Sequence, residues 1–358
     1  MNYRCLFFVA GLTTLVSLAL GQALHSPSEK DKGVKQIWKA PRTPDGHPDL
    51  QGVWANNTAT PMERPKELEG RAFLTDEEVA AMKKKAAELY NGKGDAAFGD
   101  TIFQTVFASI KGAGAASGPH IKAATEFDGG TGDYSSEWIV AREWDNRTSL
   151  ITDPPDGKLP AMTPEGIARR NASFASMLRP AAVAADRGLQ ERCITFDSPQ
   201  LIAGYQSYSQ ILQTSTSVVL LTEMIHDARV VPLDGRPHVS PTIQGWLGDS
   251  RGHWEGDTLV VDTTNYKRNS FMASSSEKLH VIERFTRTGP ESLKYEITVD
   301  DPGTWTKPWS LMIPLKHSPN PIFEYACHEG NSGLVGILAG ARAEEKAAPV
   351  STGNREQK

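Results

Sequence analysis

The sequence predicts a mainly β (α+β) protein, in which an antiparallel meander closes into a calycin-like or half-open barrel and carries an N-terminal layer of helix and loop. The chain of 358 residues contains 31 Gly and 23 Pro, which suit many short strands joined by turns. From about residue 207 onward, apolar runs follow one another with tight turns between them. A meander of about eight strands must twist and tends to close. An open β-sandwich is the alternative.

The first 23 residues have the composition of an export signal. Arg4 is followed by a nearly unbroken apolar run at 6–20, and Gly21 and Ala23 are small residues suited to a cleavage site. A transmembrane anchor is the rival interpretation, but the run is short for a span of about 20 residues. We therefore expect a periplasmic or secreted protein with no stable membrane span after signal cleavage.

The remaining chain divides into three parts. Residues 24–48 are polar and proline-containing, which predicts a disordered lead-in, and residues 346–358 form a predicted disordered tail. Between them, residues 49–345 show no internal repeat or linker and are expected to form a single β-centred domain. The segment 52–54, Gly-Val-Trp, resembles the first strand of calycin barrels, although a core tryptophan at a strand start is the favoured interpretation.

Two helices carry clear start signals. A helix is expected at 75–90, where Thr75 and Glu78 have the spacing of a capping box. A second helix begins with Thr163 as N-cap and Pro164 as first helical residue.

Short strands account for most of the rest. Residues 293–300 alternate strictly between apolar and polar side chains, as a half-buried strand does. Residues 254–258 predict a hairpin turn. A short helix is also expected at 101–111. The predicted strands are 136–140, 148–152, 208–214, 218–224, 259–261, 279–287, 293–300, 309–315 and 322–327.

Two cysteines survive signal cleavage. Removal of Cys5 leaves Cys193 and Cys327, which in an oxidising compartment predict one disulfide. Closing a loop of this length contributes about 4–5 kcal/mol through chain entropy. Two separately buried thiols are the alternative.

Composition and motifs exclude several classes of function. The formal charge of −5, without a block of Lys or Arg, argues against a nucleic-acid partner. The chain lacks a P-loop, a G-x-S-x-G elbow and a dinucleotide-binding glycine motif in a βαβ unit, so no cofactor is expected. Its histidines lack the H-x-H and H-E-x-x-H spacings typical of metal ligands, so no metal is predicted.

Titratable groups are densest between residues 223 and 263. His226 lies near Glu223 and Asp227, and an imidazole beside carboxylates can serve as general acid or base near neutral pH. Arg229 is a candidate to stabilise a developing anion. The alternative is that this cluster is the end of a surface strand with ordinary ion pairs and no catalytic role.

Two further candidates come from later strands. His328 follows the apolar run at 322–327 and is expected to converge with His226 at one barrel mouth, unless that run is merely a strand end tied by a disulfide. Glu283 interrupts an apolar strand face, so it either faces a cavity or binds an arginine. The expected substrate-binding residues are His238, His253, Trp254, Arg284, Glu324 and Tyr325.

These groups favour an exported enzyme that performs cofactor-free acid–base chemistry in a barrel cavity. Its class would be lyase, isomerase or hydrolase, and its ligand a small or oligomeric organic molecule. The alternative is a non-enzymatic, calycin-like binding protein for an apolar or amphipathic ligand, favoured if aromatic side chains dominate the cavity wall.

Three segments carry a resemblance to known sequences. These are Glu-Met-Ile-His-Asp-Ala-Arg at 223–229, the run from Gly-Asp-Ser-Arg-Gly-His-Trp to Asp-Thr-Thr-Asn at 248–265, and Glu-Tyr-Ala-Cys-His-Glu-Gly-Asn at 324–331. Together they resemble a large, mostly uncharacterised family of exported bacterial proteins, over nearly all of the mature chain. The resemblance implies export and carries no catalytic role to any residue.

Overall fold

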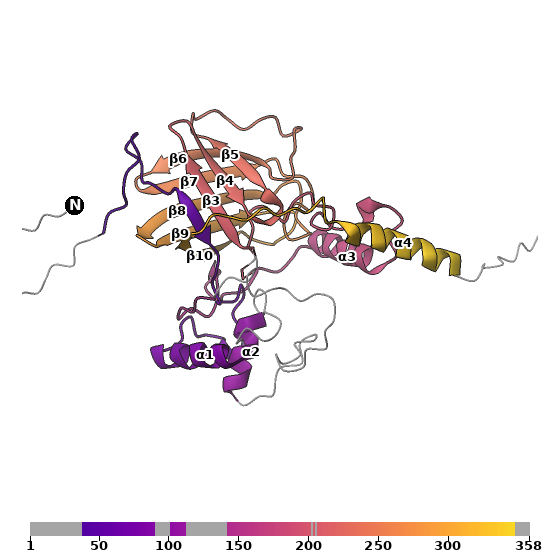
Figure 1. Ribbon diagram of the computed structural model, residues 1–358, viewed down its shortest axis with the longest axis horizontal. Helices are drawn as coiled ribbons and strands as arrows, with labels where there is room; N and C mark the ends of the chain where they lie inside the picture. The colour runs from indigo at the N-terminus through magenta and orange to yellow at the C-terminus, as the bar shows by residue number, and fades with distance from the viewer. Residues whose placement is uncertain (1–37, 90–100, 112–141, 202, 205, 348–358) are drawn as a thin grey trace, which may run out of the picture. The chain divides into compact units, whose positions relative to one another are not determined.

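The computed structural model describes residues 38–89, 101–111 and 142–347, except 202 and 205 (Figure 1). The predicted export signal at 1–23, the strand expected at 136–140 and nearly all of the predicted tail lie outside these residues. The described residues all belong to one contact unit, Trp38–Lys358.

One antiparallel sheet of ten strands dominates the fold, in the order β5-β4-β3-β1-β10-β9-β8-β7-β6, with β2 paired to β10. The sheet is half-open and not closed into a barrel, which confirms the mainly β prediction in its half-open form. The strands are β1 Gly52–Ala55, β2 Ile151–Asp153, β3 Tyr208–Gln213, β4 Ser217–Thr222, β5 Ala228–Pro232, β6 Asp249–Glu255, β7 Thr258–Thr264, β8 His280–Gly289, β9 Ser292–Asp300 and β10 Trp309–Ser318.

Two meanders, β3 to β5 and β6 to β10, are joined by the first strand of the chain. β1 pairs with β3 on one side and with β10 on the other. Its Trp54 is fully buried, and the indole N–H donates to the Leu50 carbonyl at 2.9 Å. Gly52 has a φ of +128° and a Cβ there would lie 3.1 Å from the His317 ring, so glycine allows both the bend and the close approach.

The two outer edges of the sheet, β5 and β6, approach each other without forming a ladder among the described residues. A Cβ on Gly252 of β6 would lie 2.8 Å from Val231 of β5 and 2.7 Å from Leu233 just beyond it. The missing side chain therefore lets the two wings meet through side-chain packing.

The core lies on the inner face of the curled sheet. The strict alternation expected at 293–300 is present, because Leu293, Tyr295, Ile297 and Val299 are buried while the intervening residues are half-buried. Each fully buried aliphatic side chain contributes about 1.5–3 kcal/mol relative to its exposed state. Members from the other strands include Ile211, Leu220, Val231, Leu259, Val261, Val281, Phe285, Leu311 and Ile313.

The helices are α1 Asp76–Leu89, α2 Thr101–Ile110, α3 Pro164–Leu178 and α4 Ser332–Ala347. The predicted capping box of α1 is present: the Glu78 N–H donates to Thr75 Oγ1 at 3.2 Å and the Thr75 N–H to Glu78 Oε2 at 2.9 Å. At α3, Thr163 Oγ1 accepts from the Gly166 N–H at 3.0 Å. α1 and α2 bury a second apolar cluster that includes Met82 and Phe103. Within the described residues, no helix is long and apolar enough to cross a bilayer.

The strand predicted at 322–327 is wrong, because this segment has no ladder partner among the described residues. Side-chain contacts hold it instead. The Phe323 N–H donates to the Glu223 carboxylate at 2.8 Å, and Cys327 is bonded to Cys193 with their Cα atoms 5.8 Å apart. The predicted disulfide is thus confirmed. After this segment, α4 runs from Ser332 to Ala347.

The described part of the predicted lead-in, residues 38–48, makes specific contacts. The His47 ring stacks on Trp254 with ring centroids 4.8 Å apart, and Arg42 forms an ion pair with Asp257 at 2.6 Å. These partners lie on or beside the β6–β7 hairpin, whose turn follows the prediction for residues 254–258, with Glu255 opposite Thr258. Aromatic and charged side chains therefore tether a segment whose composition alone suggests no order.

Candidate functional site

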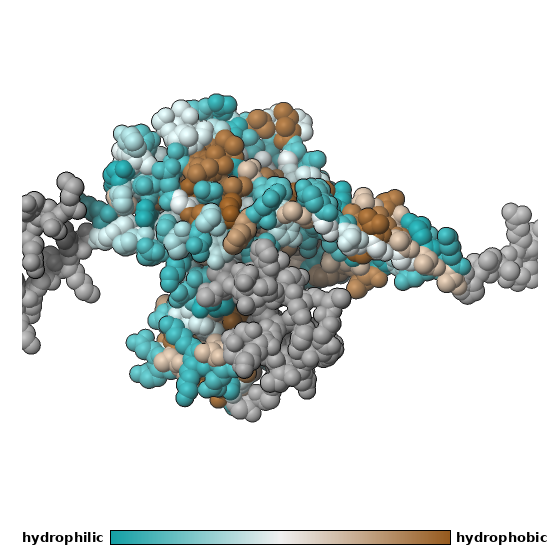
Figure 2. Space-filling view, viewed as in Figure 1, coloured by the Kyte–Doolittle hydropathy of each residue, from teal (hydrophilic) through white to brown (hydrophobic). Residues whose placement is uncertain are grey.

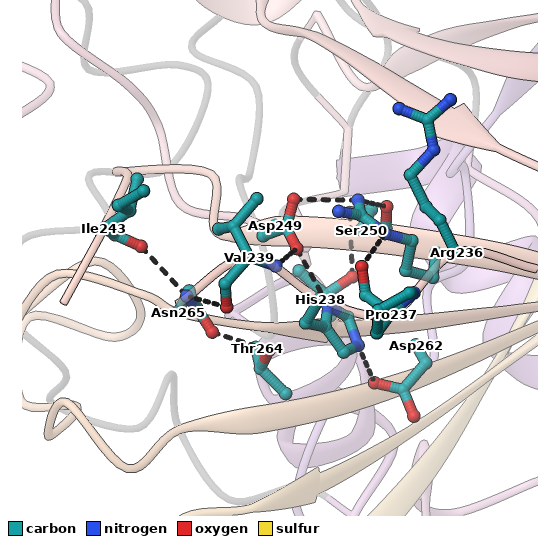
Figure 3. A network of polar contacts seen from close by, with 12 residues as sticks. Arg236, Pro237, His238, Val239, Ile243, Asp249, Ser250, Asp262, Thr264 and Asn265 are labelled. Atoms are coloured by element: carbon teal, nitrogen blue, oxygen red, sulfur yellow. Dashed lines mark hydrogen bonds and ion pairs between the residues drawn. The ribbon is translucent and has the colours of Figure 1, made fainter. Parts of the chain in front are cut away.

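A chain of imidazoles and carboxylates lies on the outer face of the sheet where β6, β7 and β8 run side by side. Figure 3 shows its members His238, Asp249 and Asp262. Its centre is Asp262 on β7. His238 Nε2 lies 3.1 Å from Asp262 Oδ1, and His280 Nε2, at the first residue of β8, lies 3.0 Å from the same oxygen. One carboxylate oxygen is therefore shared by two imidazoles.

The strand pattern explains this placement. On β7, Leu259, Val261 and Thr263 are buried on the inner face, so Asp262 between the last two points outward. On β8 the same alternation turns His280 outward and Val281 inward. Because the two strands pair with Asp262 opposite Ile282, His280 lies at the diagonal position two residues away.

His238 is held from its other side by the start of β6. Its Nδ1 lies 3.0 Å from Asp249 Oδ2, while Arg251 donates to Asp249 Oδ1 at 2.8 Å. The loop that carries His238 is fastened by Asn265, whose amide donates to the carbonyls of Val239, Ser240 and Ile243; the bonds to Val239 and Ile243 are visible in Figure 3. The imidazole is thus fixed in orientation through both ring nitrogens.

The contacts shift the acidities of the group. The hydrogen bond to Asp262 raises the pKa of His280, against a smaller opposing effect of burial. The same bond from His280 lowers the pKa of Asp262. Burial pushes the pKa of Asp249 upward, but its hydrogen bonds from Val239, His238 and Arg251 outweigh that and lower it overall. The carboxylates are therefore held ionised beside a more basic imidazole.

A hollow of about 550 Å³ opens beside the imidazole–carboxylate chain. Both His238 and His280 line it, together with polar and cationic groups such as Lys278 and Gln244. His280 Nε2 faces Asp262, and its Nδ1 has no hydrogen-bond partner in the part of the chain that the structure describes. The His280 ring, with one nitrogen free of hydrogen bonds among the described residues, thus lines a groove large enough for a small organic molecule.

The candidates Arg229 and Glu283 lie on the opposite, inner face. Arg229 donates to both Glu283 oxygens, at 2.5 and 2.7 Å, and the Tyr295 hydroxyl also donates to Glu283. Glu283 has no exposed surface, and the arginine side chain is 11% exposed. Burial opposes the charge of Arg229, but Glu283 outweighs it and raises the arginine pKa. Burial and the Glu283 charge raise the pKa of Tyr295.

This ion pair fills the place where a barrel cavity was expected. The space enclosed beside Arg229, Tyr295 and Trp54 is about 50 Å³, room for a few waters rather than for an organic ligand. Of the two alternatives predicted for Glu283, it binds an arginine. That arginine lies on β5, which is not adjacent to β8 in the sheet. Both oxygens of Glu283 accept hydrogen bonds from Arg229, so this carboxylate has a structural role.

The structure does bring the His226 and His328 segments together. His226 Nδ1 lies 3.1 Å from the Tyr325 carbonyl oxygen, and the disulfide at Cys327 fixes the same segment. Both histidines are exposed, and no hydrogen bond joins their rings within the described residues. His226 and Ile225 both adopt positive φ, 46° and 61°, so the turn after β4 is strained.

Their predicted acidic partners, the buried Glu223 and the half-buried Asp227, have structural roles. Glu223 is 1% exposed and accepts the Phe323 N–H, and burial raises its pKa. Asp227 accepts from the Thr195 hydroxyl at 2.6 Å, and burial raises its pKa as well. Among the described residues neither carboxylate forms a hydrogen bond with an imidazole ring, although the nearby His226 acts on the Asp227 pKa through its charge, so this cluster lacks the geometry of an acid–base pair.

The other predicted binding residues are spread over the surface. His253 and Arg284 both bind the exposed Glu255, at 3.1 and 2.6 Å. Trp254 stacks on His47, and Glu324 is exposed. Of the predicted residues, His238 alone belongs to the imidazole–carboxylate chain. Asp249, Asp262 and His280 were missed, although Asp262 stands out as an acid inside an apolar run.

No group of three or more His, Cys, Asp or Glu side chains with the geometry of a metal site occurs among the described residues. In the imidazole–carboxylate chain, the Nε2 atoms of His238 and His280 both face Asp262, and His238 Nδ1 faces Asp249. The nitrogen and oxygen atoms of these side chains are therefore arranged to form hydrogen bonds with one another.

Comparison with protein families, with curated proteins and with solved structures finds no match to this chain. The resemblance to an exported bacterial family stays a prediction.

Proposed function

We propose that this protein is an exported enzyme that performs cofactor-free acid–base chemistry on a polar organic substrate bound in the groove beside His280. The observation that carries the proposal is the single Asp262 oxygen shared by His238 and His280, with the free nitrogen of His280 on a ring that lines the groove. A carboxylate bound to one nitrogen of an imidazole fixes its tautomer and stabilises the imidazolium that forms when the other nitrogen takes a proton.

The roles follow from the contacts. Neutral His280 carries its proton on Nε2 and donates a hydrogen bond from there to Asp262. The Nδ1 lone pair is then left to accept a proton from the substrate, or from a water molecule that attacks the substrate. Asp262 then stabilises the positive charge on the ring. His238, held by Asp249, orients Asp262 from the other side. Lys278 lines the same groove without an ion-pair partner among the described residues and can stabilise a developing anion.

The groove suits an extended substrate that carries both polar and apolar groups. It opens to solvent on the outer sheet face, and its lining combines polar side chains such as Gln244 and Lys278 with apolar ones such as Val239 and Leu279. This moves the expected chemistry from the sheet interior to its outer surface. A hydrolase or lyase acting on an oligomeric substrate fits this setting best, because an open groove admits part of a longer chain.

The experiment compares wild type with His280→Gln and Asp262→Asn across a panel of nitrophenyl esters, nitrophenyl glycosides and acidic polysaccharides. We expect wild-type turnover of at least one class, with a loss of about 10²–10⁴-fold in His280→Gln. The matched control is His253→Gln, because His253 is an exposed histidine that binds Glu255 outside the groove. Equal activity in His280→Gln and His253→Gln would contradict the proposal.

A further inference from the structure

A second hollow lies on the molecule away from the imidazole–carboxylate chain. It has a volume of about 500 Å³ and lies between α3, the loop at 272–274 and Trp305. Its walls are largely apolar and rich in flexible side chains, including Met162, Met177, Met272 and Phe174. We call it the α3 cleft.

The walls of the α3 cleft are fastened to one another. Ser173 on α3 donates to the Ala273 carbonyl at 2.8 Å, and Arg169 donates to the Ser274 carbonyl at 3.0 Å. Arg169 also binds the Gly303 carbonyl at 2.6 Å, close to Trp305. The helix and the loop are therefore held at a fixed spacing, so the cleft is preformed and a ligand need not open it.

The loop wall is strained. Met272 and Ala273 are consecutive non-glycine residues with φ of 50° and 51°, in the left-handed region, and both line the cleft. Such conformations persist only where the surroundings enforce them, and they cluster at binding sites. Here they turn the Met272 side chain to the cleft wall.

The apolar surface continues outside the cleft. Phe174 is 57% exposed and Leu178 at the end of α3 is 86% exposed. Figure 2 shows apolar residues gathered on this face where α3 and α4 lie. Large exposed apolar side chains around a preformed hollow mark a binding surface for an apolar group.

One cation lines the cleft without a partner. Arg170 is exposed, and no hydrogen bond or ion pair involves its guanidinium among the described residues, whereas its neighbour Arg169 is engaged by backbone carbonyls. The acidic residue of the cleft, Glu63, is already engaged, since its Oε1 accepts the Leu159 N–H at 2.9 Å. Glu63 keeps its negative charge, but the cation without a partner among the described residues is Arg170, and a guanidinium suits a carboxylate, which arginine binds through two parallel hydrogen bonds.

We infer that the α3 cleft binds an apolar monocarboxylate, an aliphatic or aromatic acid of about the size of a medium-chain fatty acid. The methionine and aromatic walls take the apolar body, and Arg170 takes the carboxylate. Methionine side chains adapt to ligands of differing shape, so the site recognises a class rather than one molecule. No described residue lines both the α3 cleft and the groove at His280, so the inference does not rest on the proposed catalysis.

The experiment is isothermal titration calorimetry of the full mature chain with octanoate, octanol and octylamine, three probes of equal chain length. We expect octanoate to bind most tightly. Arg170→Gln should weaken octanoate by about two- to fivefold and leave octanol unchanged, because an exposed arginine–carboxylate pair is of modest strength. Ile167→Phe, on an exposed position of α3 that lines the cleft, should weaken octanoate and octanol alike by filling the space.

Arg42→Gln is the control, because it removes the same charge from a surface ion pair that does not line the cleft. Three outcomes would overturn the inference: no binding of any probe, tighter binding of octylamine than of octanoate, or an unchanged octanoate affinity in Ile167→Phe. A concentration-dependent dimer that Phe174→Ser abolishes, without octanoate binding, would assign the cleft to a second copy of this chain and would also overturn it.

Discussion

Arg229 and Glu283 join two strands that are far apart in the sheet. Arg229 lies on β5, an edge strand, and Glu283 on β8, near the opposite edge, yet their two hydrogen bonds measure 2.5 and 2.7 Å. The pair therefore spans the interior of the half-open sheet and holds its two wings together.

Removing the charge of Glu283 should be costly. Glu283→Gln leaves the Arg229 cation buried without its counter-ion, so we expect the free energy of unfolding to fall by about 3–5 kcal/mol in urea denaturation. The control is Glu296→Gln on β9, where the glutamate pairs with Lys294 at 38% exposure and the loss should stay below about 1 kcal/mol. The double variant Arg229→Met with Glu283→Leu should recover most of the loss. Equal stability of Glu283→Gln and Glu296→Gln would rule out a structural role for the pair.

The His280 imidazole should titrate above its ordinary value of 6.5, because Asp262 raises its pKa. Proton-detected NMR of the ring signals, assigned with His280→Gln, measures the midpoint directly. Asp262→Asn removes the carboxylate charge and should lower that midpoint, whereas Asp257→Asn on the β6–β7 turn should not. A His280 midpoint at or below 6.5 in wild type would contradict the shared-carboxylate geometry.

The same shift predicts how stability depends on pH. Because the folded-state pKa of His280 is raised, protonation of this residue favours the folded state. That contribution is fully present below about pH 6.5 and is lost as the pH rises through the folded-state pKa. The urea midpoint of Asp262→Asn should therefore vary less with pH across this window than that of wild type. An unchanged pH dependence in Asp262→Asn would show that the contact between His280 and Asp262 does not contribute to the free energy of unfolding.

The disulfide should stabilise the fold through the length of the loop that it closes. Cys193 and Cys327 are 134 residues apart, for which chain entropy predicts about 5 kcal/mol. The double variant Cys193→Ala and Cys327→Ala should lose a large part of that in urea denaturation, and hydrogen exchange should rise at 323–331. Intact mass after alkylation should show no free thiol before reduction. Two alkylated thiols in the unreduced mature protein would contradict the bond.

Export predicts a new N-terminus. Protein from the native host should begin within a few residues of Leu24, as N-terminal sequencing or intact mass would show. A chain that retains Met1 in the cytoplasm would refute both the signal and the oxidising compartment.

Local patterns were enough to predict most strands and the helix starts. Alternation identified the strand at 293–300, and the Thr75–Glu78 spacing identified the start of α1. Each of these signals is carried by residues only a few positions apart in the sequence. The insertion of β1 between β3 and β10 was not predictable in this way. Its pairing joins residues more than 150 positions apart, for example Gly52 with Ile211, and no local pattern encodes such a register.

The candidate site was only partly predictable for the same reason. His238 was identified from the density of charged residues, but an outward-facing acid such as Asp262 is ordinary on a strand with one wet face. Its significance depends on the register that places His280 beside it. Conversely, the segments of His226 and His328 do meet, but through a backbone carbonyl and a disulfide, which residue types alone do not distinguish from an acid–base pair.

The seam between β5 and β6 has a consequence for how this protein behaves at high concentration. Free strand edges template the addition of strands from other chains and so promote aggregation. Here the two edges of the sheet face each other, with Val231 and Leu233 against Gly252, so an incoming strand finds no open row of amides at that place. A larger residue at 252 would force the edges apart and expose both as templates. We therefore expect Gly252 to favour solubility as well as the packing of the two edges.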